Sequence, residues 1–133
     1  MPKARSRPLR VINSIAPIRI CDNGGWTDTW FAGYGQIFNI AVYPYAEVQI
    51  EVHPFRDQKD RIVINAENFG ERYSLGREHK TWDRHPLLEA AIGFMKIPRD
   101  MAFEVTIFSE APSGGSTGTS AAVTVALIGA LDR

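Results

Sequence analysis

The chain has 133 residues, 44% of them hydrophobic, which is enough to bury the core of one domain. Fifteen basic and fifteen acidic residues give a formal net charge of zero, so the composition favours neither nucleic-acid binding nor electrostatic attachment to a membrane. The single cysteine, Cys21, excludes an internal disulfide framework and favours a reducing, cytoplasmic environment. No apolar run is long enough to span a bilayer, and the three histidines lack metal-ligand spacing.

Most of the chain before residue 110 predicts strands. Residues 9–15 alternate and contain β-branched side chains, which predicts a first strand that Pro17 ends before residues 18–20 resume an extended run. Period-two alternation predicts the other strands, at residues 35–42, 46–53, 61–65, 72–75 and 102–108. We expect the first two of these to be separate strands joined by a turn at residues 43–45.

Two segments have the composition of helices. Residues 86–94 start at Pro86, which suits the first turn of a helix. One side of this helix is expected to be apolar, through Leu87, Leu88, Ala91 and Ile92. Residues 121–131 predict a second helix, in which only Thr124 carries a polar group. Alternating strands with late helices predict an α+β fold, with a mainly antiparallel sheet and both helices on one face.

The composition of the predicted helix at residues 121–131 indicates an apolar surface that the rest of the chain does not cover. A helix that is apolar on all sides must be covered on all sides, and one short helix at residues 86–94 is not enough. We therefore expect the amino-terminal part of a longer protein, with residues 1–8 as a flexible basic arm and residues 9–133 as the domain. If the outer side of the last helix is left uncovered, we expect it to pack against a second copy of the chain in a homo-oligomer.

A loop of small residues precedes this last helix. Its three glycines, Gly114, Gly115 and Gly118, permit positive φ and leave the backbone open to a ligand. Hydroxyl groups come from Ser113, Ser116, Thr117, Thr119 and Ser120. Ser120 is expected to be the N-cap of the helix. Backbone N–H groups at the positive end of a helix dipole favour a phosphate group.

Two known phosphate-binding patterns do not fit this loop. No lysine follows the last glycine, as a P-loop requires, and the glycine spacing is not that of a dinucleotide-binding loop. A surface turn without a ligand is the alternative. The apolar strand before the loop and the apolar helix after it favour a binding loop instead, because they would hold it rigidly.

Two motifs together resemble the GHMP kinase superfamily, named for galactokinase, homoserine kinase, mevalonate kinase and phosphomevalonate kinase. The first motif, Ala-Pro-x-Arg followed by Gly-Gly-x-x-Asp, matches residues 16–19 and 24–28. The second, Pro-x-Gly-x-Gly-Leu-Gly-Ser-Ser-Ala, falls on residues 112–121. Ser116, Thr117 and Thr119 depart from the second motif, and the Cβ of Ser116 narrows the loop. The resemblance implies the amino-terminal domain of the family, with its fold similar to domain 2 of ribosomal protein S5.

The resemblance also implies a function: an ATP- and Mg²⁺-dependent kinase that acts on a sugar or sugar phosphate. The loop at residues 24–28 is similar to that of heptose-phosphate kinases and fucokinases, which implies transfer to an anomeric hydroxyl. The ATP-binding residues implied are Pro112, Ser113, Gly114, Gly115, Ser116, Thr117, Gly118, Thr119 and Ser120, of which Thr119 or Ser120 contacts the metal. Arg19 is implied as catalytic and substrate-binding. The other substrate-binding residues implied are Asn23, Gly25, Trp26, Thr27 and Asp28.

Each of these roles has an alternative. Arg19 fits a surface strand residue and Asp28 an ordinary turn aspartate, while Trp26 and Trp30 fit either an apolar wall for a sugar or core packing. In the family, a catalytic aspartate and an acidic metal ligand come from regions beyond those matched here. A nucleotide- or sugar-binding module without turnover is therefore the alternative function.

Overall fold

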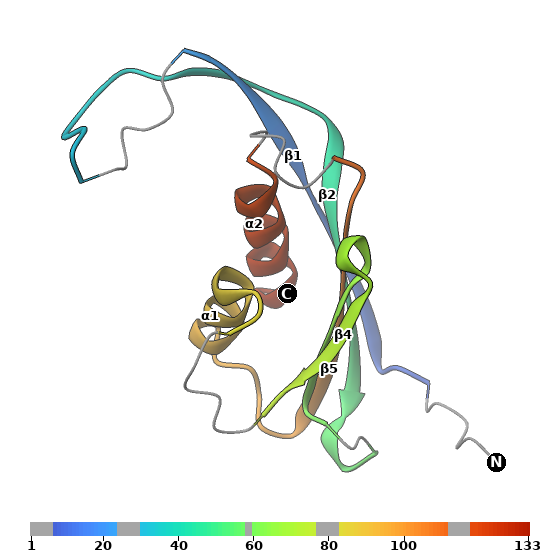
Figure 1. Cartoon of the computed structure of the whole chain (residues 1–133). Helices are drawn as coiled ribbons and strands as arrows, with labels where there is room; N and C mark the ends of the chain where they lie inside the picture. Colours follow the sequence, from blue (N-terminus) through green and yellow to red (C-terminus); the bar gives the residue numbers. More distant parts are fainter. Residues whose placement is uncertain (1–6, 24–29, 58–59, 77–82, 112–117) are drawn as a thin grey trace.

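A computed structural model describes residues 7–23, 30–57, 60–76, 83–111 and 118–133. Its five-stranded sheet has the order β1-β2-β5-β3-β4. The elements are β1 (Arg10–Asn23), β2 (Phe38–Pro54), η1 (Phe55–Asp57), β3 (Ile62–Ala66), η2 (Glu67–Phe69), β4 (Glu71–Leu75), α1 (Pro86–Phe94), β5 (Met101–Ser109) and α2 (Thr119–Leu131). All neighbouring strands are antiparallel except β3 and β5, which are parallel. Both helices lie on one face of the sheet (Figure 1), so the predicted α+β fold is confirmed.

The core lies between the sheet and the helices. Alternate residues of the central strands point toward the helices, and the buried side chains include Val48, Ile50, Ile64 and Val105. Leu127 of α2 is fully buried against them. Each such aliphatic side chain contributes about 1.5–3 kcal/mol on burial. This packing fixes α2 against the sheet.

The two long strands differ from the prediction. β1 continues through Pro17, and β2 runs unbroken from Phe38 to Pro54 instead of forming two strands. Pro17 pairs with Tyr45 but Ile18 pairs with Val42, so the register shifts at this point. A shift of register leaves residues outside the ladder, and an edge strand such as β1 tolerates a missing N–H. Pro17 in β1 and Pro44 in β2 therefore end neither strand.

The paired strands β1 and β2 extend past the first turn of α2, and residues 30–37 curve to the side of the sheet on which the helices lie (Figure 1). This segment carries large exposed side chains. Trp30 is 94% exposed and packs edge-on against Phe31, so core packing is wrong for this tryptophan. No helix within the described residues is both long and apolar enough to cross a membrane.

The second helix begins earlier than the sequence predicts. Gly118 is its N-cap, with a φ of 68°, and Thr119 is its first residue. Ser120 therefore lies inside the first turn, and the prediction that it is the N-cap is wrong. One side of α2 is buried, but Val125 is 62% exposed and Ile128 40%. The residues that the structure describes thus cover only part of the apolar surface of this helix.

Candidate functional site

Arg19 of β1 lies against Gly118, the residue that starts α2. A Cβ built on Gly118 would be 2.9 Å from Arg19 Nε and 3.2 Å from Arg19 Cγ. Only a residue without a side chain leaves room for the arginine at this position, and only glycine adopts a positive φ there without strain. The contact therefore places a permanent positive charge beside the N-terminus of α2.

The N-terminus of α2 has no acidic residue in its first turn. Among the residues that the structure describes, no side chain forms a capping hydrogen bond to it. The first bond of the helix is donated by Ala122 N–H to the Gly118 carbonyl oxygen over 2.9 Å. Ser120 is exposed and Thr119 half-buried, so hydroxyl groups stand at this helix end. The helix dipole and Arg19 together favour an anion here.

The N-terminus of α1 is different, because an internal carboxylate occupies it. Glu89 is only 1% exposed and accepts hydrogen bonds from the backbone N–H groups of Asp83, Arg84 and His85 over 3.1–3.3 Å. The Tyr73 hydroxyl of β4 donates a fourth bond over 3.1 Å. The first turn of α1 thus faces a carboxylate of the chain itself, whereas the first turn of α2 contains no acidic residue.

A cavity of about 250 Å³ adjoins the first turn of α2. η2, the start of α1, the end of β5 and the first two turns of α2 bound it, and its lining includes Phe69, His85, Ile107, Thr119 and Val123. The lining combines aliphatic side chains and the Phe69 and His85 rings with polar side chains, among them Asn68 and Ser120. A cavity of this kind suits a flat, partly polar ligand.

Two pairs of interactions hold the walls of this cavity. Asn68 of η2 donates to the Ser109 carbonyl oxygen over 2.6 Å and accepts from the Ser109 N–H over 2.7 Å, which fixes η2 to the end of β5. The His85 ring lies 5.1 Å from the Phe69 ring, and its Nε2 lies 3.3 Å from a carboxylate oxygen of Glu71. These contacts give the cavity a defined shape without a ligand.

Tyr73 of β4 contacts both α1 and the segment before it. Its ring lies 5.0 Å from the Arg84 guanidinium carbon, and its hydroxyl donates to Glu89. Burial, together with the hydrogen bond to this carboxylate, raises the pKa of Tyr73 above its ordinary value. Tyr73 therefore keeps its proton, and donates to Glu89, to a higher pH than an ordinary tyrosine would.

Neither a family model nor a curated protein matches the sequence. Solved kinases do share the fold. D-glycero-D-manno-heptose 1-phosphate kinase from Bacteriodes thetaiotaomicron matches 91% of this chain at 22% identity and a TM-score of 0.61, with 40% of its own chain covered. Galactokinase from Lactococcus lactis, solved with galactose, matches 90% at 19% identity and a TM-score of 0.60, with 31% covered. Mevalonate kinase from Methanococcus jannaschii matches 92% at 17% identity and a TM-score of 0.59, with 39% covered.

The chain has the fold of the GHMP-family kinases. It spans less than half the length of these solved structures. Of the site that the GHMP motifs predict, the structure brings together Arg19 from the first motif and Gly118, Thr119 and Ser120 from the second. Residues far apart in the sequence thus meet at one helix end.

The remaining predicted site residues stay predictions. Gly25, Trp26, Thr27 and Asp28 lie outside the described residues, as do Pro112, Ser113, Gly114, Gly115, Ser116 and Thr117. Asn23 pairs with Phe38 at the end of β1. Among the described residues, no group of three histidine, cysteine, aspartate or glutamate side chains could hold a metal ion.

The sequence patterns missed the cavity and misassigned one side of α1. Leu87 was expected on the apolar side but is 53% exposed, while Glu89 is buried beside Ile92. The cavity residues of η2 come from a polar segment without periodicity, so no pattern marked them. The one available signal was the position of Glu89, which the helical period places next to Leu88 and Ile92.

Proposed function

We propose that this chain is the amino-terminal region of a GHMP-family kinase that transfers a phosphoryl group from ATP to a sugar or sugar phosphate. The observation that carries the proposal is the contact between Arg19 and Gly118 at the N-terminus of α2, beside the cavity. Phosphoryl transfer depends on positioning and charge stabilisation, and both are available at such a helix end. The single cysteine accords with a cytoplasmic enzyme.

In this proposal the nucleotide phosphates lie against residues 112–120. N–H groups at the start of α2 donate to the phosphate oxygens, and the Arg19 guanidinium offers a second, charged donor for the transferring group. Mg²⁺ binds oxygen ligands, and in such sites water molecules and substrate phosphates supply several of them. A hydroxyl of Thr119 or Ser120 therefore fits as a protein ligand, and the ion would neutralise phosphate charge.

We place the nucleotide base in the cavity next to these phosphates. Phe69 and His85 offer ring faces, and Val123 and Ile107 offer aliphatic surface. The ring systems of nucleobases stack on such groups. We assign the sugar to the residues that the first motif implies: Asn23, Gly25, Trp26, Thr27 and Asp28. The likeness to a heptose 1-phosphate kinase and a galactokinase favours a sugar or sugar phosphate as acceptor.

A module that binds a nucleotide or a sugar without turnover is the second candidate. The observation that favours it is the share of the solved kinases that this chain spans, between 31% and 40% in the three described above. Groups that complete a kinase site can lie in the part of those structures that has no counterpart here. We expect this chain to bind ATP and to lack turnover by itself.

Calorimetric titration with Mg²⁺ and ATP, followed by an assay for ADP release with a panel of sugars and sugar phosphates, tests both candidates. Saturable ATP binding with turnover by the full-length protein supports the kinase, and binding without turnover by any form supports the module. A protein that binds neither ATP nor a sugar would contradict both. Arg19→Ala is the matched variant, because it removes the charge at the helix end and leaves the cavity lining intact.

A further inference from the structure

We propose that Glu89 is a positioning residue for the base of the nucleotide: its buried carboxylate holds the segment before α1 so that Arg84 and His85 form one wall of the cavity. The inference rests on the proposed function, because it assumes that the cavity takes the base. It concerns a residue outside both GHMP motifs and within a helix that the sequence marks only as apolar.

The carboxylate is almost fully enclosed and fully engaged. One oxygen accepts from Arg84 N–H (3.3 Å), His85 N–H (3.1 Å) and the Tyr73 hydroxyl (3.1 Å), and the other accepts from Asp83 N–H (3.2 Å). Consecutive backbone N–H groups that converge on one point form a nest for an anion. In this nest the anion is part of the chain, so the segment at residues 83–85 is tied to α1.

An apolar residue would fill the same space at a lower cost of desolvation. Burying a carboxylate is unfavourable unless hydrogen bonds replace its water. Glu89 has such bonds, but every backbone donor among them belongs to residues that precede α1. Its place among Leu88 and Ile92 thus serves the conformation of that segment more than the packing of the core.

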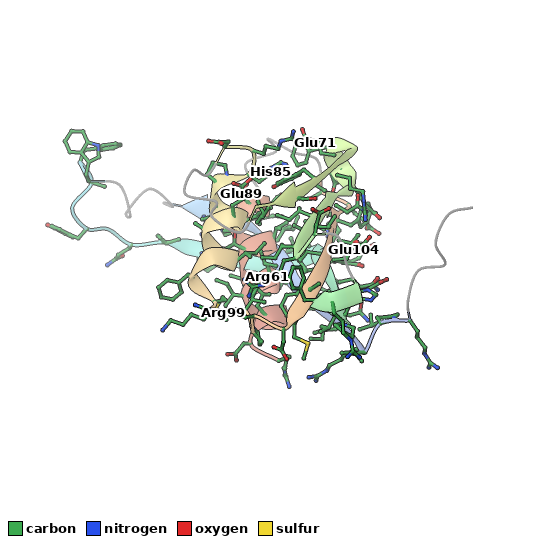
Figure 2. The ribbon with its side chains drawn as sticks, turned by 90° about the horizontal axis from the view of Figure 1, so that it is seen from below. Arg61, Glu71, His85, Glu89, Arg99 and Glu104 are labelled. Carbon is green, nitrogen blue, oxygen red and sulfur yellow. The ribbon has the colours of Figure 1, made fainter. Side chains whose placement is uncertain are left out.

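The segment that Glu89 holds carries two side chains of the cavity wall. Arg84 lies over the Tyr73 ring, and His85 lies between Glu71 and the Phe69 ring. Figure 2 shows Glu71, His85 and Glu89 close together on one side of the molecule. Tyr73 contacts both Glu89 and Arg84, so β4, the segment and α1 form one unit. Loss of the hydrogen bonds to the Glu89 carboxylate therefore loosens the cavity wall that faces the nucleotide base. The phosphate end of the site, with Arg19 and Gly118, stays in place.

The test compares two probes, ATP and inorganic triphosphate, on the wild type and on Glu89→Gln. The variant keeps the size of the side chain but turns one acceptor oxygen into an N–H donor that faces a backbone N–H. We expect about a tenfold loss of affinity for ATP, the value of one hydrogen bond to a charged group, and unchanged affinity for triphosphate. Glu104→Gln is the matched control, because Glu104 binds Arg72 and lies away from the cavity (Figure 2). It should change neither affinity.

Equal losses for ATP and triphosphate would show a general structural role and overturn the proposal, as would unchanged ATP affinity in a folded Glu89→Gln protein. Amide hydrogen exchange tests the anchor without a ligand. The amides of residues 83–85 should be protected in the wild type and in Glu104→Gln and lose protection in Glu89→Gln. If the wild type binds no ATP but this exchange pattern is seen, the proposed function fails while the anchoring role of Glu89 stands; unchanged exchange overturns that role.

Discussion

Replacing Gly118 by alanine should damage the site in two separable ways. The first is backbone strain: φ is 68° at this residue, and a Cβ in this region costs roughly 1–2 kcal/mol. The second is steric: the new Cβ would lie 2.9 Å from Arg19 Nε and 3.2 Å from Arg19 Cγ, both closer than van der Waals contact. Since Nε and Cγ lie along the length of the side chain, the guanidinium must move away from the end of α2.

Gly33→Ala is a control for the strain alone. Gly33 has a φ of 70°, and a Cβ there would meet nothing within 4 Å. Chemical denaturation should show a similar loss of stability, about 1–2 kcal/mol, in both variants. Calorimetry with ATP and Mg²⁺ should show weaker binding only in Gly118→Ala, by about tenfold if one charge-assisted hydrogen bond is lost.

A double-mutant cycle isolates the contact. In an Arg19→Ala background the added methyl group of Gly118→Ala meets no arginine, so it should cost little further ATP affinity. The reasoning is refuted if Gly118→Ala binds ATP like the wild type, or if it weakens binding by the same factor with and without Arg19.

Three further predictions concern other parts of the chain. Because the pKa of Tyr73 is raised, the folded state keeps this proton to higher pH than the unfolded chain does, and the stability it contributes below the unfolded-state pKa is lost above it. Tyr73→Phe should therefore lessen the fall of stability at alkaline pH in denaturation curves. An unchanged fall would count against the bond to Glu89. Ile128→Lys should reduce self-association measured by sedimentation, since this residue lies on the uncovered side of α2; a wild type that stays monomeric would contradict this. Asp28→Asn in the full-length protein should weaken sugar binding more than ATP binding, and equal losses would indicate a folding role.

The sequence predicts the secondary structure well where the local patterns agree with one another. The bounds of α1 agree with those expected from Pro86 and the helical period, and the strands after residue 60 agree to within one residue at each end. In these segments, turn residues and alternation indicate the same boundaries. The α+β arrangement follows from their order.

The predictions fail where long-range contacts override a local rule. Pro17 predicts the end of a strand, yet a register shift at the sheet edge lets β1 continue. Ser120 is a good N-cap by type, but the αL conformation of Gly118 starts the helix earlier. Neither event is visible in the residues beside it.

The candidate site was predictable only through its motifs. The motifs mark Arg19 and Gly118, but no periodicity shows that they touch. The cavity forms where η2, α1, β5 and α2 pack together. Glu89, which anchors its wall, is of a residue type that is usually exposed on a helix, but it is buried here. Tertiary packing forms the cavity, which no sequence pattern marks. For Glu89 the helical period gives one signal, its position next to Leu88 and Ile92, but a charged residue type favours exposure.

A titration of the isotope-labelled chain with ATP and Mg²⁺, followed by NMR, tests the central claim most directly. The account predicts that the largest shifts occur at the backbone amides of residues 118–121 and at the Arg19 Nε–H, with smaller shifts at Phe69 and His85 in the cavity. Shifts confined to other parts of the chain, or no shifts at saturating ATP, would contradict the assignment of the α2 terminus as the phosphate site.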